Sequence, residues 1–371
     1  EAGAVAFTDG VRAIASARYG QQAAFAFPAQ PQLPPVLLWD PRVAGLDDAR
    51  AVAMGRDAIH NILAEFPDAD CSGEIEWTLE SRFILNTSGL CLSEAGTRFS
   101  AGFNALRVHG ESFVCPGEGV ESRLLTPDLA PWAGRVRHWL RLARREATLG
   151  VERLPVIFTP RGLDTLIEAL EASLDGKNLQ KGLSLFAGRQ GQRVMDPRLT
   201  LLDDPLVNYA PGSARFDSEG VPTRSKALIQ DGVVQSFIYD LQTAGLMNTQ
   251  PTGNAAGGSG APPVPGFTNL RLAPGDTPVQ DMIRSAQRAL LVDEVLGAGQ
   301  SNILAGDFSV SLELAFLIER GEIAGRVKNA MVAGNALDAF NHVGAISRER
   351  EWNGDSQFPA IEFHDLSITG R

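Results

Sequence analysis

The chain has 371 residues, of which 44% are hydrophobic and 21% are charged, and its formal net charge is −11. This composition is typical of a soluble globular protein, and the length allows two domains of ordinary size. The acidic balance argues against a nucleic-acid partner, because nucleic acids bind clustered Lys and Arg side chains.

The three cysteines, Cys71, Cys91 and Cys115, form an odd number without paired spacing. This pattern predicts reduced thiols, as in a cytosolic protein. The sequence has no run of ~18 apolar residues and does not open with the charged and apolar regions of a signal peptide. We therefore expect a cytoplasmic protein without a membrane span.

The first 150 residues are expected to form an N-terminal α/β domain with a β meander. Their apolar spacing predicts a strand and a short helix in residues 1–20, a helix in 46–66, three strands in 74–85, 91–99 and 101–109, and a helix in 126–150. Asp47 and Asp48 suit the N-terminal end of the first long helix. The arginines of the last helix are interpreted as a solvated face. We place the domain boundary at Gly150, so that the C-terminal domain comprises residues 151–371.

The C-terminal domain is expected to be mostly antiparallel β structure with packed helices, which makes the fold class α+β. The turn Asp231-Gly232 between two β-rich runs predicts a hairpin, and Gly176 suits a left-handed position at the end of a helix. Residues 255–265 are expected to be a flexible loop. The remaining spacing predicts strands in residues 154–158, 308–319, 324–333 and 360–369, and helices in 163–174, 279–290 and 335–343.

Four carboxylates, Asp203, Asp204, Asp217 and Glu219, lie close together in the sequence. Such a cluster suits the binding of a cation or of a peptide amine. Asp, Ser, Gly and Pro are also the residues that tight turns need, so turn formation is the simpler interpretation. Both interpretations remain open at this point.

A series of short motifs in the C-terminal domain resembles the TldD/PmbA family. The motifs include Asp203-Asp204-Pro205, Thr252-Gly253-Asn254, Gly306-Asp307-Phe308-Ser309 and Ala333-Gly334-Asn335, and their order is that of the family. Each motif is weak alone, but the shared order is specific. The family contains TldD-like zinc-peptidase subunits and PmbA-like (TldE) partner subunits that lack the metal motif.

The helix expected in residues 163–174 resembles the helix that carries His-Glu-x-x-x-His in TldD-like subunits. There, two imidazoles hold zinc and the glutamate activates its water. The resemblance places Ile167 and Ala172 at the two histidine positions and Glu168 at the glutamate position. Neither Ile nor Ala can bind zinc, and no cysteine follows Cys115 to match the family's further ligand. Glu168 is then a remnant of the motif, and we expect no metal or cofactor in this chain.

The resemblance implies a metal-free PmbA/TldE-like subunit of a zinc metallopeptidase complex. Its TldD-like partner would hold the zinc, and the two subunits would enclose a cavity where small or unfolded peptides are cleaved. The candidates for the substrate cavity are Asp203, Asp204, Asp217, Glu219 and Asn254. Two alternatives remain: a self-pairing protein that binds peptides without cleaving them, and a metal-independent peptide-tailoring enzyme.

Overall fold

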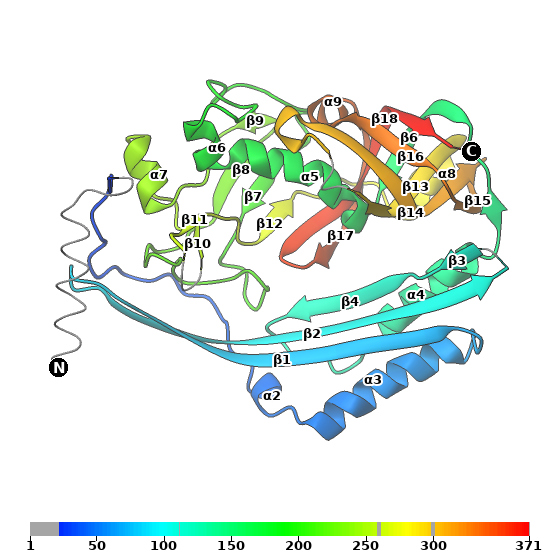
Figure 1. Cartoon of the computed structure of the whole chain (residues 1–371), viewed down its shortest axis with the longest axis horizontal. Coiled ribbons are helices and arrows are strands. Elements are labelled where there is room, and N and C mark those ends of the chain that lie inside the picture. Colours follow the sequence, from blue (N-terminus) through cyan, green and yellow to red (C-terminus); the bar gives the residue numbers. More distant parts are fainter. Residues whose placement is uncertain (1–21, 111, 258–260, 298–300, 371) are drawn as a thin grey trace.

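The computed structural model describes residues 22–110, 112–257, 261–297 and 301–370 and shows an α+β protein (Figure 1). The strand and helix expected in residues 1–20 lie outside the described residues. Two sheets dominate: a small one in the N-terminal half and a large one in the C-terminal half. Within the described residues, no helix is long and apolar enough to cross a membrane.

A long hairpin is the frame of the N-terminal half (Figure 1). β1 (Asp70–Leu85) and β2 (Cys91–His109) pair antiparallel along the whole length of β1. β3 (Ser112–Val114) and β4 (Gly117–Ser122) pair with the other edge of β2. The expected three-stranded meander in residues 74–109 is therefore wrong. Ser100 does not end a strand, because it continues the ladder opposite Glu76.

Helices α2 (Pro41–Ala44), α3 (Asp48–Leu63) and α4 (Ala130–Leu142) complete this half. Asp47 caps α3 by accepting a hydrogen bond from the backbone N–H of Arg50 at 2.8 Å, as its position predicts. The buried residues of α3 recur every three or four positions and pack on β2 around Phe99 and Phe103. α4 is shorter than expected, because its chain continues into β5 (Glu146–Ala147), which pairs with the large sheet.

Five strands of the large sheet close into a ring. They are β6 (Val151–Phe158), β13 (Arg288–Leu296), β14 (Asp307–Glu319), β16 (Met331–Asn335) and β18 (Ser356–Thr369). β13 pairs with β6 and β14, β18 pairs with β6 and β16, and β14 pairs with β16. Only the pair of β6 and β13 is parallel within this ring. The residues 324–333 thus belong to two strands, not to the single strand expected.

Further strands extend the ring on both sides. They are β7 (Leu201–Asp203), β8 (Lys226–Gln230), β9 (Val233–Val234), β12 (Leu270–Leu272), β15 (Glu322–Val327) and β17 (Val343–Asn353), with β10 (Ala255–Ala256) and β11 (Val264–Pro265) as a separate pair. The hairpin turn at Asp231-Gly232 is confirmed, with both residues at positive φ (51° and 74°). The expected loop at residues 255–265 is held at its base by β10 and β11.

Helix α5 (Pro160–Leu174) packs on the ring with the apolar face that the sequence predicts, and Thr159 is its N-cap. Gly176 does not end it in a left-handed conformation; it begins the next helix, α6. A side chain there would meet the Tyr239 ring, since a Cβ would lie 2.3 Å from a ring carbon. The other helices are α6 (Gly176–Gln180), α7 (Leu241–Leu246), α8 (Val279–Ser285), α9 (Ala336–Asn341) and the 3₁₀ turn η2 (Ile303–Ala305).

Candidate functional site

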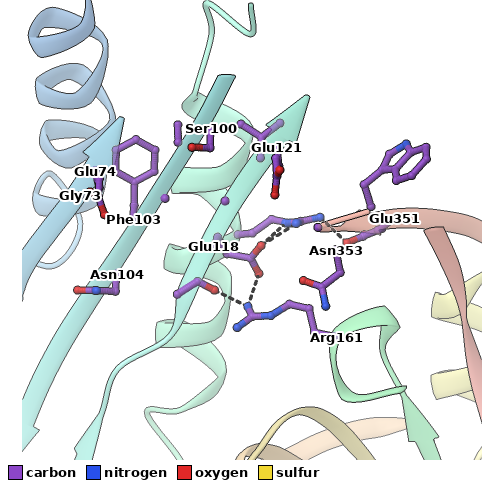
Figure 2. Close-up of a pocket in the computed structure, with 18 of the residues that line it drawn as sticks. Gly73, Glu74, Ser100, Phe103, Asn104, Glu118, Glu121, Arg161, Glu351 and Asn353 are labelled. Atoms are coloured by element: carbon purple, nitrogen blue, oxygen red, sulfur yellow. Dashed lines mark hydrogen bonds and ion pairs between the residues drawn. The ribbon is translucent and has the colours of Figure 1, made fainter. Parts of the chain in front are cut away.

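A polar cleft of about 840 Å³ lies between the two halves of the molecule (Figure 2). One wall is formed by β1, β2 and β4 and carries Glu74, Asn104 and Glu121. The other wall is formed by the start of α5, with Arg161, and by the end of β17, with Glu351. The cleft therefore brings together residues that are far apart in the sequence.

Glu118 on β4 is the centre of an ion network that joins the two walls (Figure 2). Its side chain is only 3% exposed and accepts hydrogen bonds from Arg135 Nε and Trp139 Nε1, both at 2.8 Å. Arg161 Nη1 lies 3.5 Å from Glu118 Oε1 and also donates to the carbonyl of Gly117. Because both arginines are paired, the network fixes the walls and leaves little free positive charge in the cleft.

No local sequence pattern singles out Glu118, Arg161 or Glu351, because they come from three separate elements. Arg135 belongs to the helix face that the sequence predicts to be solvated. Instead, it pairs with Glu118 and with Glu351 across the cleft. The only signal in the sequence is a helix rich in arginine within an acidic chain, which suggests ion pairs but not their partners.

The face of α5 near the end of β17 is acidic. Asp164, Glu168 and Glu171 lie four and three residues apart, which places them on one side of the helix. Burial, together with the nearby carboxylates, raises the pKa of Asp164 and of Glu171 to about 7. Burial also raises the pKa of Glu168, and Asn353 donates a hydrogen bond to Asp164. Asp164 and Glu171 are therefore only partly ionised near neutral pH.

The residues of α5 do not fit a zinc ion. Ile167 is 2% exposed and packs in the main core, and Ala172 offers only a methyl group, so neither supplies a ligand atom. Across the described part of the chain, no group of three or more His, Cys, Asp or Glu side chains is arranged to hold a metal ion.

Two of the candidate cavity residues, Asp203 and Asn254, are brought together by the fold. Asp203 is fully buried and accepts hydrogen bonds from Lys226 Nζ at 2.6 Å, from Asn254 Nδ2 at 2.8 Å, and from the backbone N–H and hydroxyl of Thr268, both at 2.7 Å. The carboxylate thus ties β7 to β8 and to the segment before β12. This geometry favours a structural role for Asp203.

The other three candidates lie in the same loop region but have separate partners. Asp217 accepts from three backbone N–H groups, and Asp204 pairs with Arg271 at 2.8 Å. Burial raises the pKa of Glu219 to about 7, and its carboxylate accepts a hydrogen bond from the backbone N–H of Leu241. None of the five candidates lines the polar cleft.

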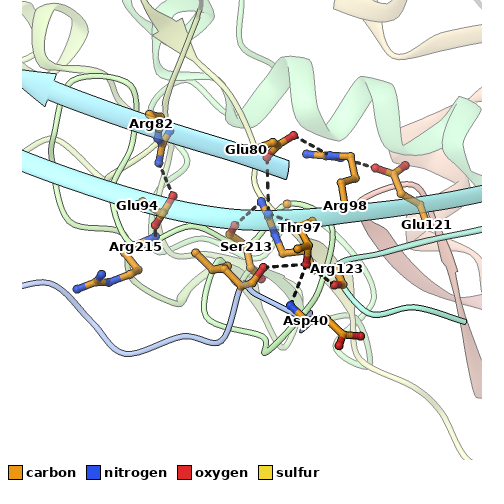
Figure 3. Close-up of polar contacts among 12 residues, drawn as sticks. Asp40, Glu80, Arg82, Glu94, Thr97, Arg98, Glu121, Arg123, Ser213 and Arg215 are labelled. Carbon is orange, nitrogen blue, oxygen red and sulfur yellow. Dashed lines mark hydrogen bonds and ion pairs between the residues drawn. The ribbon is translucent and has the colours of Figure 1, made fainter. Parts of the chain in front are cut away.

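The loop that carries Asp217 is attached to the long hairpin (Figure 3). Arg123, which follows β4, donates to the carbonyl of Ser213 at 3.0 Å and to that of Thr97 at 3.3 Å. Glu94 on β2 accepts a hydrogen bond from the backbone N–H of Arg215 at 2.7 Å. These contacts hold the hairpin in a fixed position on the C-terminal half.

A family model described as the PmbA/TldA metallopeptidase C-terminal domain matches residues 151–370. The chain belongs to the PmbA/TldD family. It is 34% identical over 187 residues to a "Metalloprotease TldD homolog" of Haemophilus influenzae, which covers 50% of this chain and 39% of that protein. It is 26% identical over 253 residues to "Metalloprotease PmbA" of Escherichia coli O157:H7, which covers 67% of this chain and 52% of that protein. The chain thus spans about half the length of the curated relatives it matches.

Solved structures of PmbA/TldD-type proteins have the same fold. TldE from Thermococcus kodakarensis matches with a TM-score of 0.85 and 25% identity, covering 95% of this chain and 81% of that one. A Thermotoga maritima protein described as a candidate modulator of a DNA gyrase matches with a TM-score of 0.84 and 23% identity, covering 94% of this chain and 81% of that one. The second match shows the fold alone.

Proposed function

We propose that this chain is a metal-free, PmbA/TldE-like subunit that pairs with a TldD-like zinc subunit and helps to enclose a space where small or unfolded peptides are cleaved. The observation that carries the proposal lies on α5, where Ile167 is in the core and Ala172 has no ligand atom. A likeness to TldE over 95% of the chain supports it. In this role the chain contributes surfaces, and its partner contributes the metal.

The outer part of the hairpin supplies a surface that suits a partner. Leu79, Phe83 and Leu85 alternate along one face of β1 and are 56%, 74% and 73% exposed. Among the described residues, β1 has a strand partner along its β2 edge only. Exposed apolar side chains next to a free strand edge are typical of an interaction surface.

The polar cleft supplies a place for an extended peptide. β4 pairs with β2 along one edge, and the Gly117 carbonyl of β4 accepts a hydrogen bond from Arg161 on the opposite wall. Among the described residues no strand pairs with the other edge of β4, and this edge faces the cleft. An extended peptide adds to such an edge through backbone hydrogen bonds, and the acidic side chains Glu74 and Glu76 favour peptides with basic residues.

Assembly and activity test the proposal together. The chain is purified alone and together with a TldD-like subunit. Light scattering measures the mass of each sample, and a second assay measures the cleavage of an unfolded peptide. We expect a one-to-one complex, with cleavage only when the zinc subunit is present. A chain that stays separate from several TldD-like subunits, or that cleaves peptides alone after metal removal, would contradict the proposal.

A pair of charge substitutions on the surface tests where the partner binds. Phe83→Asp should weaken the complex by at least roughly tenfold, the size expected for loss of a buried apolar anchor. Val52→Asp is the matched control, because Val52 is also exposed (57%) but lies on α3. Equal effects of the two substitutions would exclude the β1 face as the interface.

A further inference from the structure

A second cavity, of about 730 Å³, adjoins the polar cleft and has a different character. Five residues of the ion network and its surroundings line both spaces: Glu118, Arg135, Pro160, Arg161 and Glu351. Beyond them, the walls are mostly apolar and come from α4, α8, β13 and β15. The apolar lining residues include Trp139, Leu142, Val279, Ile283, Leu291 and Ile323.

Asp293 is the most deeply buried ionisable residue that lines this cavity, with 2% exposure. It lies in a β-bulge of β13, since Val292 pairs with Ala315 and Glu294 with Leu314, which leaves Asp293 without a ladder partner. Bulges re-aim side chains and are common beside binding sites. Here the bulge places a carboxylate at the end of an apolar space.

Only one of the two carboxylate oxygens of Asp293 accepts a hydrogen bond from the described residues. Its Oδ1 accepts a hydrogen bond from the Thr159 hydroxyl at 2.7 Å, whereas its Oδ2 is buried and has no hydrogen-bond partner among the residues that the structure describes. The closest approach of Arg161 to Oδ2 is 3.4 Å, and Arg161 also pairs with Glu118 and Glu294. A buried acceptor without a donor is costly, so a donor from a ligand would be stabilised there.

Negative charge is in excess around this acceptor. Four carboxylates, Glu118, Asp293, Glu294 and Glu351, share two guanidinium groups, Arg135 and Arg161. Burial and the neighbouring carboxylates raise the pKa of Asp293 to about 6 despite the opposing effect of Arg161. A bound cation would bring the net charge of these four carboxylates and two guanidinium groups closer to zero.

We propose that this cavity binds a primary amine that carries an apolar group. The ammonium group would donate to Asp293 Oδ2, and the apolar group would lie against Trp139 and Ile283. The same chemistry is found in a free aromatic or aliphatic amine and at the amino end of a peptide with an apolar first residue. The cavity belongs to this chain alone, so binding does not require a partner subunit.

Titration calorimetry with the full chain and two compounds of similar shape tests whether binding requires the positive charge of the amine. Phenethylamine should bind with one site per chain, and 2-phenylethanol should bind at least roughly tenfold more weakly, because it lacks the charge that completes a buried charged hydrogen bond. Equal affinity for both compounds, or no binding of the amine at millimolar concentration, would overturn the proposal.

Three variants locate the site. Asp293→Asn keeps the acceptor for Thr159 and should reduce amine affinity to that of the alcohol, while alcohol affinity changes by less than about twofold. Glu322→Gln is the matched control, since it removes an exposed carboxylate that lines the same cavity and should leave amine binding unchanged. If Asp293→Asn does not fold, Ile283→Phe fills the apolar part instead and should weaken both ligands. Amine binding that keeps its full affinity in a folded Asp293→Asn or Ile283→Phe variant would place the ligand elsewhere.

The pH dependence gives a second readout. Amine affinity should rise between about pH 5 and about pH 8 as Asp293 loses its proton, and Asp293→Asn should flatten this rise. The charged groups around Asp293 are Glu118, Arg135, Arg161, Glu294 and Glu351. His138 also lines the cavity, and burial lowers its pKa, so its protonation at low pH would add to the same trend. A rise of equal size in Asp293→Asn would assign the effect to His138 and contradict the role of Asp293.

Two dipeptides distinguish the sources of the amine. Phe-Ala-amide carries a free amino end, and N-acetyl-Phe-Ala-amide does not. Binding of the first without the second would identify a site for the amino end of a peptide. Binding of phenethylamine alone would identify a site for small amines. Equal binding of both dipeptides would show that no ammonium group is recognised.

Discussion

At the scale of single residues, Asp203 shows how strongly a buried carboxylate depends on its partners. Asp203→Ala would leave Lys226 without a counter-charge, although the Lys226 side chain is only 8% exposed. Breaking a buried pair in this way costs about 3–5 kcal/mol of unfolding free energy. Unfolding in urea, followed by circular dichroism, should therefore show a much lower midpoint for the variant.

Asp204 provides the control for this prediction. Its ion pair with Arg271 is more exposed, with side chains 16% and 20% exposed, so Asp204→Ala should cost about 1 kcal/mol or less. If both variants lost the same stability, the hydrogen bonds of Asp203 would not explain its effect. A loss of peptide cleavage in a stable Asp204 variant would instead support its place in the substrate cavity.

Glu168 tests whether the family's glutamate has kept a role. We propose that it occupies the position of the motif glutamate, with Ile167 and Ala172 at the two histidine positions, so that the helix offers no imidazole to a metal. Glu168→Gln should leave the activity of the reconstituted complex within about twofold. A loss of about 100-fold with normal assembly is the size of effect expected for a general base and would contradict this prediction.

At the scale of elements, the acidic face of α5 makes stability depend on pH. The pKa of Glu171 rises from 4.5 to about 7 on folding, so between these values the folded protein holds more protons than the unfolded chain. The free energy of unfolding therefore falls as pH rises through this window. Asp164 changes in the same direction.

Glu171→Gln should flatten this fall and raise the melting temperature at about pH 8, because the variant has no carboxylate to ionise. Melting temperatures measured from about pH 5 to about pH 8 would show the difference. Glu168→Gln is the comparison within the same helix, and its effect should be smaller, since Glu168 is less buried. If the melting temperature of Glu171→Gln fell more steeply with pH than that of the unchanged protein, the ionisation of Glu171 would not explain the fall in stability.

The sequence predicts elements well where one face of the element is buried. The spacing of apolar residues indicates α3 and α5, because their buried residues recur at helical intervals. It misses β17 and divides β2 at Ser100, where the chain has small residues but the ladder with β1 continues. Strand continuity depends on the partner strand, and a single strand's sequence does not contain that information.

The residues of the candidate sites also differ in whether the sequence alone can reveal them. The absence of histidine from α5 can be read from the sequence, because it concerns one short segment. The cleft and the apolar cavity cannot, because Glu118, Arg161 and Asp293 meet only after three elements have packed. The bulge that turns Asp293 toward the cavity is also a property of strand pairing, and no residue type near it predicts an unpaired position.

At the scale of the whole molecule, metal content is the most direct test of the proposed subunit type. The isolated chain should bind no stoichiometric zinc, because α5 provides no pair of imidazoles. Elemental analysis after dialysis measures this. About one zinc per chain would contradict the prediction, since zinc retained through dialysis needs three or four ligands.

The closed ring of five strands also sets the order in which the protein can form. β6 begins the C-terminal half and β18 ends it, yet the two pair directly, from Phe158 opposite Ile361 to Val151 opposite Thr369. Until β18 is in place, β6 and β16 each lack one neighbour of the ring, and their edges remain open to other chains. β18 therefore closes the ring, and it covers the strand edges that are most open to wrong pairing.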